Sequence, residues 1–238
     1  MPAVATADAR RLRAAAAASA LLARTLGPDT DALVDPETHD AVVAALEAAD
    51  APAALSRLDS CRTSVSAGPS ELAGRWVRWF DLGRVAPYEG SNVVSTAGGV
   101  TPRLADVAGF YKAFGLQVVD DRPDHVIAQL EFLAMALLAQ AEAIESGDEA
   151  AEQETSRAIR SFLRDHLGGW IDVWASRVAA IDELEPWVPF AAAAAELVRT
   201  EATRRNVIPL SEAAVLPADA GLAEDYEAVV SCEDALED

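Results

Sequence analysis

Alanine-rich segments punctuated by glycine and proline follow one another along most of the chain, and this pattern constrains the fold more than any other feature. Residues 14–18 and 191–195 are uninterrupted alanine. Alanine has the highest helix propensity, whereas sheets are enriched in aromatic and β-branched residues, and only 6% of this chain is aromatic. We therefore predict an all-α fold, a single globular domain of about eight to ten helices.

Capping residues and helix breakers predict where these helices begin and end. One helix is expected over 101–114, and a long apolar helix is expected to begin after Asp121 and to end at Ser146-Gly147. Asp121 is the expected N-cap of this long helix, and Pro123 lies in its first turn, where no backbone donor is needed. The longest internal loop is expected over 84–102, and loops of this length are often functional.

The end of the chain differs in composition from the rest. Nine acidic residues and no basic residue follow Arg205. Such a segment buries too little apolar surface to fold independently. We predict a single helical domain over 1–210 and an acidic, partly disordered tail over 211–238.

The charge balance excludes some partners. The formal net charge is −20 and 51% of residues are apolar. Nucleic acids and anionic membranes attract basic proteins, so a cationic partner is the natural complement of this chain. Cys61 and Cys232 lie far apart in no metal-binding spacing, and no segment has the roughly 18 continuous apolar residues of a membrane span. These features predict a cytoplasmic protein without membrane insertion.

Aromatic side chains share one face of a helix predicted from Ser70 to Gly83. Leu72, Trp76, Trp79 and Phe80 repeat at the spacing of a helical stripe. Such a stripe is usually core, and a binding role for it is the alternative.

Catalysis has little support in the sequence. Asp120, Asp121 and Asp124 match the D-D-x-x-D pattern with which all-α isoprenoid diphosphate enzymes hold magnesium, but the expected helix start makes an acidic cap the simpler interpretation. No histidine has glutamate three positions before it, as a di-metal bundle would need, and three histidines are too few for a histidine-rich phosphohydrolase site. No phosphate-cradling or dinucleotide motif occurs. We predict no enzyme, no cofactor and no metal, with the magnesium enzyme as the alternative.

Several short motifs occur in the order known from one family. These segments are Pro87-Tyr88-Glu89-Gly90-Ser91, Leu104–Tyr111 with Phe114-Gly115-Leu116, Asp121-Arg122-Pro123-Asp124-His125 with Leu130-Glu131-Phe132-Leu133, and Phe162–Trp170. Together they resemble the TorD/DmsD/NarJ family, cytoplasmic chaperones of molybdenum enzymes.

The resemblance implies a non-catalytic helical protein, either a monomer or a homodimer. Its partner would be the catalytic subunit of a molybdoenzyme of the dimethyl sulfoxide reductase class, or the twin-arginine leader of that subunit, held until the cofactor is inserted. The charge of −20 suits such a leader, because a carboxylate can form two charge-assisted hydrogen bonds with one arginine. A helical adaptor for an unrelated acceptor is a further alternative.

The resemblance also implies a set of client-binding residues. Asp121 stands where the family has glutamate, and Gln129 replaces a frequent glutamate. We expect Tyr88 and Asp124 to be exposed, and we expect His125 either to face the client or to hold the Tyr88 loop. The full candidate set is Trp79, Tyr88, Glu89, Asp121, Pro123, Asp124, His125, Gln129, Glu131 and Phe132.

Overall fold

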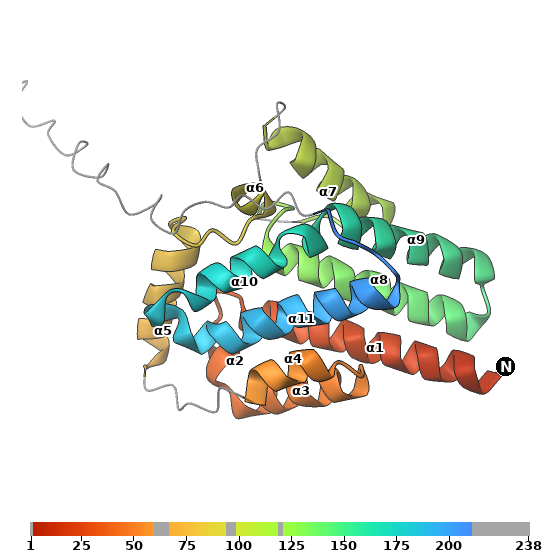
Figure 1. Cartoon of the computed structure of the whole chain (residues 1–238), viewed down its shortest axis with the longest axis horizontal. Helices are drawn as coiled ribbons and strands as arrows, with labels where there is room; N and C mark the ends of the chain where they lie inside the picture. Colours follow the sequence, from red (N-terminus) through yellow and green to blue (C-terminus); the bar gives the residue numbers. More distant parts are fainter. Residues whose placement is uncertain (1, 60–66, 94–98, 119–120, 211–238) are drawn as a thin grey trace, which may run out of the picture.

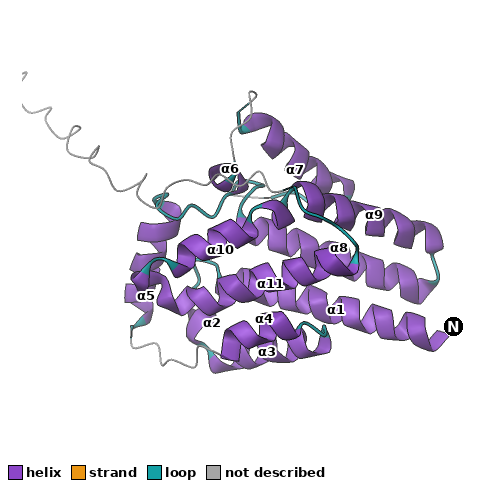
Figure 2. Ribbon diagram, viewed as in Figure 1, coloured by secondary structure: helices purple, strands orange, loops and turns teal. Residues whose placement is uncertain are grey.

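The structure is a bundle of helices (Figures 1 and 2). This computed structural model describes residues 2–59, 67–93, 99–118 and 121–210. An isolated antiparallel bridge pairs Tyr88 with His125, and no strand is assigned within these ranges. The predicted all-α class is therefore confirmed.

Four long helices form the body of the bundle. They are α1 (Pro2–Thr25), α8 (Val126–Ser146), α9 (Glu149–Asp165) and α11 (Val188–Arg204). In sequence order the shorter elements are α2 (Asp31–Val34), α3 (Pro36–Ala48), α4 (Pro52–Asp59), α5 (Pro69–Trp76), the π-helical turn η1 (Val77–Asp81), α6 (Glu89–Asn92), α7 (Thr101–Ala113), the 3₁₀ turn η2 (Leu167–Gly169), α10 (Ile171–Ala179) and the 3₁₀ turn η3 (Asp182–Trp187).

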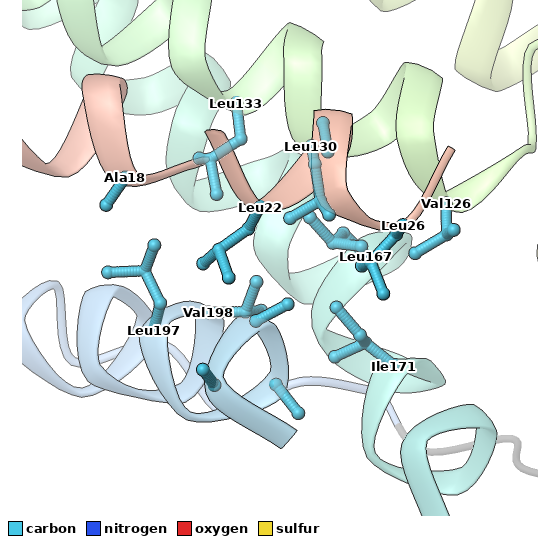
Figure 3. Close-up of a cluster of buried hydrophobic side chains, with 14 of the residues drawn as sticks. Ala18, Leu22, Leu26, Val126, Leu130, Leu133, Leu167, Ile171, Leu197 and Val198 are labelled. Atoms are coloured by element: carbon cyan, nitrogen blue, oxygen red, sulfur yellow. The ribbon is translucent and has the colours of Figure 1, made fainter. Parts of the chain in front are cut away.

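The core lies where α1, α8, α10 and α11 meet. Figure 3 shows Leu22 of α1, Leu130 of α8 and Leu197 of α11 pointing into one cluster, and all three are fully buried. Small alanines on α1 and α11 let the helix backbones approach closely, which is why alanine-rich segments can form a dense core. Burial of apolar surface in this cluster contributes about 25 cal/mol per Å² to stability.

The long helix α8 is apolar enough and long enough to span a membrane by composition alone. In the structure, however, it packs along α1 on one side and α9 on another (Figure 1), and 56% of its most apolar window is buried. Core helices of folded proteins pass the same composition test, so its apolar character is explained by its central position.

The start of α8 differs from the prediction. The helix begins at Val126, and its N-cap is His125, whose Nδ1 accepts a hydrogen bond from the backbone N–H of Ile127. The predicted cap Asp121 lies before the helix, and so does Pro123. Backbone groups of Asp124 and Val126 form hydrogen bonds with the loop around Tyr88, and this pairing holds the residues before Val126 outside the helix.

The end of α8 and the bounds of α7 agree with the prediction. Gly147 closes α8 in the left-handed conformation with φ 72°, which glycine adopts without strain. The predicted helix over 101–114 is present as α7, one residue shorter at its end.

The aromatic stripe of α5 and η1 belongs mainly to the core. Phe80 packs against Trp174 and Trp187, each with ring centroids 5.9 Å apart. Trp79 is 9% exposed, and its indole N–H donates to Glu183. The core interpretation is thus confirmed for Phe80, and Trp79 shows little of its ring to a partner.

Candidate functional site

Two segments far apart in sequence meet at the mouth of α8. The backbone N–H of Glu89 donates to the carbonyl of Asp124 at 2.9 Å, and that of Val126 donates to the carbonyl of Pro87 at 2.8 Å. Between these two bonds lies the bridge from Tyr88 to His125. The two motifs that carry most of the predicted site are therefore one structural unit.

Asp124 lies at the centre of this unit and is fully buried. Arg122 donates to both of its carboxylate oxygens, from Nε at 2.9 Å and from Nη2 at 2.8 Å. The backbone N–H of Gly90 donates to the same carboxylate at 3.0 Å. The prediction that Asp124 is exposed is wrong, because an arginine of its own chain covers its carboxylate.

A stack of side chains closes the outer side of the unit. The guanidinium carbon of Arg122 lies 4.4 Å from the centre of the Tyr88 ring, a cation–π arrangement. The Tyr88 ring also packs on His125 in a T-shaped arrangement, with centroids 5.0 Å apart. Tyr88 is half-buried. Burial raises the pKa of its hydroxyl, and the negative charge of Asp121 raises this pKa further.

His125 occupies a structural position. Its side chain is 3% exposed, and it caps α8 as described above. Burial lowers the pKa of its imidazole and outweighs the opposite effect of Asp121, whose carboxylate lies 3.9 Å from Nε2. The geometry favours the alternative in which His125 holds the Tyr88 loop.

Glu89 is fully buried and is the hub of a second polar network. Its carboxylate accepts hydrogen bonds from Arg103 at 2.7 Å and from the amide of Gln129 at 2.5 Å, and it lies 3.1 Å from Nδ1 of His166. The amide oxygen of Gln129 accepts from the indole of Trp170. A buried charge is tolerated when such partners compensate its lost hydration, so this network joins the Tyr88 loop to α7, α8 and η2.

An apolar groove lies beside this unit, along the first turns of α8. Its volume is about 460 Å³. Carboxylates of Asp121 and Glu131 stand at its wall, and both side chains are exposed. Its apolar lining comes from Pro28, Leu116, Val118, Ile127, Phe132 and Met135.

Phe132 and Glu131 lie differently in the groove, one buried in its floor and one exposed at its wall. Phe132 is 2% exposed and packs on Phe162 with centroids 4.5 Å apart, so it forms part of the floor and of the core. Partial burial raises the pKa of the Glu131 carboxyl. Met135, one turn further along α8, is 46% exposed.

Comparison with known proteins places this geometry in a family. The model of the nitrate reductase delta subunit family matches residues 40–176, which include both loops and most of the groove. The chain belongs to this family. It is 32% identical to the selenate reductase assembly chaperone protein of Thauera selenatis over 140 residues, which cover 56% of this chain and 69% of that protein. It is also 28% identical to the chlorate reductase assembly chaperone protein of Ideonella dechloratans over 144 residues, covering 58% and 72%.

Family membership confirms the resemblance to the TorD/DmsD/NarJ chaperones and the prediction that the chain is not an enzyme. In the acidic motif, both carboxylate oxygens of Asp124 accept from Arg122. The described ranges contain no group of three or more side chains suited to a metal ion. Asp120 of the alternative magnesium motif lies outside the described residues.

The structure thus divides the predicted site into two parts. Tyr88, Asp121 and Glu131 reach the surface, and Phe132 lines the groove. The buried members are Glu89, Asp124, His125 and Gln129. Pro123 is part of the loop, where its carbonyl accepts from the hydroxyl of Tyr111 at 2.6 Å, and Trp79 lies apart from the groove in η1.

Sequence reasoning missed two sets of residues. Arg103, His166 and Trp170 complete the Glu89 network. His166 and Trp170 occur in a recognised motif, which signalled importance but not a partner. Pro28, Val118 and Met135 line the groove. They are ordinary apolar residues, and no sequence signal distinguishes them from core.

Proposed function

We propose that this family member binds the catalytic subunit of a molybdoenzyme of the dimethyl sulfoxide reductase class, through its twin-arginine leader or its apo form. Binding would hold the subunit in the cytoplasm until the cofactor is inserted, before assembly or export. The curated relatives are named assembly chaperones of selenate reductase and chlorate reductase. Their names support an enzyme subunit, rather than a small molecule, as the ligand.

One observation carries the proposal: the surface part of the family motif borders an apolar groove with acidic side chains at its wall. A leader combines arginines with an apolar stretch, and the groove offers a complement to both. The net charge of −20 would also accelerate the encounter with a cationic segment.

Calorimetry tests the proposal directly. The full chain is titrated with the leader peptide of the molybdoenzyme subunit encoded beside it, and separately with that apo subunit. We expect saturable binding of at least one of them and no binding of a scrambled leader. Absence of binding to both ligands would contradict the proposal, and recovery of an unrelated protein by affinity capture would then favour the adaptor alternative.

A further inference from the structure

An exposed patch on η1 and the turn after it combines apolar and basic side chains. Leu82 and Val77 are 71% and 44% exposed. Arg84 is also exposed, and its guanidinium carbon lies 5.6 Å from the centre of the Trp79 ring. Among the residues that the structure describes, no acidic side chain pairs with Arg84. Turns of π-helix such as η1 are rare and frequent at functional sites, so this patch is a candidate binding surface.

Ion pairs compensate the neighbouring charges. Arg78 donates to the carboxylate of Glu183 at 3.0 Å, and its side chain is 59% exposed. Arg75 donates to the carboxylate of Glu71 at 2.5 Å. Basic and acidic side chains, with Asp81 of η1 included, thus balance around the patch, whereas the whole chain has a net charge of −20. The η1 patch is defined as Val77, Arg78, Leu82 and Arg84.

The last described residues bring the acidic end of the chain toward this patch. After α11 the chain turns back across η2, where the backbone N–H of Leu210 donates to the carbonyl of Arg164 at 2.8 Å. Figure 1 shows this segment, in blue, returning from the end of α11 to the junction of α9 and α10. Gly169 permits the approach, since a Cβ atom there would lie 2.5 Å from the carbonyl oxygen of Leu210. Leu210, the last described residue, thus lies beside η2.

The η1 patch is within reach of the chain that follows Leu210. Trp174 of α10 packs on Phe80, and its indole N–H donates to the carbonyl of Val85, so it contacts the chain on both sides of the patch. At about 1.5 Å per residue along α10, with one indole side chain added, the patch lies roughly 20 Å from Leu210. Residues 211–222 can span about 40 Å when extended.

The acidic end has a sequence pattern that matches the patch. Within residues 222–230, four apolar or aromatic residues recur at the spacing of one helix face, with three acidic residues between them. The apolar set is Leu222, Tyr226, Val229 and Val230, and the acidic set is Glu224, Asp225 and Glu227. A short segment of this kind gains little from helix propensity alone and needs a surface against which to bury its apolar side. A surface that is both apolar and basic complements it.

We propose that residues 222–230 bind to the η1 patch of the same chain, with their acidic side chains on Arg84 and Arg78 and their apolar side chains against Leu82 and Val77. The proposal goes beyond the proposed function, because it gives the acidic end of the chain a binding surface of its own. This surface lies on an element that does not line the groove beside α8.

Tethering and charge favour this occupant over the competing ones. A flexible connection that spans the distance gives an effective concentration on the order of millimolar, which a second copy in dilute solution does not reach. Two copies with a net charge of −20 each would also repel one another. Nucleic acids and anionic lipids would meet the same repulsion.

Photo-crosslinking of the full chain tests the proposal. A benzophenone side chain is placed at position 82, and in a control protein at position 135, where the exposed Met135 lies in the groove. Mass spectrometry maps the products, and mixing isotopically light and heavy copies distinguishes crosslinks within one chain from those between two chains. We expect crosslinks from position 82 to residues 222–230 of the same chain, and at least fivefold fewer of them from position 135.

Charge variants test which groups hold the segment. Arg84→Glu should lower the yield of these crosslinks roughly fivefold, because repulsion replaces attraction, whereas Arg157→Glu, at an exposed arginine of α9, should change it less than about twofold. Adding Glu224→Arg and Glu227→Arg to the Arg84→Glu protein should restore most of the yield. Melting temperatures identify any variant that fails to fold, and Arg84→Gln then replaces Arg84→Glu.

Several outcomes would overturn the proposal. Crosslinks that form mainly between two chains would make a second copy the occupant of the η1 patch. Equal yields from positions 82 and 135, or a yield that Arg84→Glu leaves unchanged, would show that residues 222–230 have no specific site there. None of these measurements uses a client, so each outcome leaves the proposed function as it stands.

Discussion

Nδ1 of His166 lies 3.1 Å from the carboxylate of Glu89, and this contact joins residues 77 positions apart in the chain. Around it the Tyr88 loop, α7, α8 and the turn η2 share one buried polar centre. Figure 1 shows α6 and α7 along the edge of the bundle where this centre lies. The residues that define the family motif therefore first build the loop unit, and only its outer side is available to a client.

Glu89→Ala should destabilise the protein by about 3–5 kcal/mol, because it removes the buried carboxylate that accepts hydrogen bonds from Arg103 and Gln129. Urea unfolding followed by circular dichroism measures the change. Glu142→Ala, which removes an exposed carboxylate from α8, should cost less than about 0.5 kcal/mol. Equal effects of the two substitutions would contradict the role of Glu89 as a structural hub.

Asp124→Ala should lower stability by roughly 2–4 kcal/mol, because the buried carboxylate binds Arg122 and the backbone N–H of Gly90. Asp121→Ala is the matched control, since its side chain is exposed and its loss should change stability little. Thermal unfolding of both variants gives the comparison. A stable Asp124→Ala variant that has lost only client binding would restore Asp124 as a recognition residue.

The stability contributed by His125 should depend on pH. Burial lowers the pKa of its imidazole in the folded state, so the unfolded chain takes up a proton more readily. The contribution is complete above the ordinary histidine pKa of about 6.5 and is lost as the pH falls toward the lower folded value. Unfolding free energies of wild type and His125→Asn, whose side chain can still cap a helix, should converge between neutral pH and pH 5. A difference that is constant over this range would contradict the prediction.

Gly168→Ala should destabilise the protein by about 1–3 kcal/mol. A Cβ atom at this position would clash with the carbonyl of Leu163, and it would lie 3.0 Å from the ring of Pro209. Gly74→Ala is the matched control, because a Cβ atom there meets nothing within 4 Å and helix propensity favours alanine. Calorimetric melting should show a lower Tm for the first variant and an unchanged or higher Tm for the second.

Local signals in the sequence were sufficient for the helical class and for many helix ends. The alanine content predicts helices, and Gly147 and Asp148 mark the junction of α8 and α9, because propensity and capping act within one or two turns. The same capping rules predicted the wrong first residue for α8. Asp121 has the chemistry of a cap, but hydrogen bonds to a loop more than 30 residues earlier hold its neighbours outside the helix.

The motif around Asp121 and His125 and its acidic character could likewise be recognised from the sequence. The sequence could not predict which of its side chains reach the surface, because burial depends on neighbours that are distant in the chain. Arg122 covers Asp124, and Glu89 turns inward to Arg103 and His166. Packing of the segment after α7 against the first turns of α8 left Asp121 and Glu131 outside and an apolar groove between them. Short-range backbone preferences thus account for the helices, whereas the division of this motif into a buried frame and an open surface arises from long-range packing and the cost of burying charge.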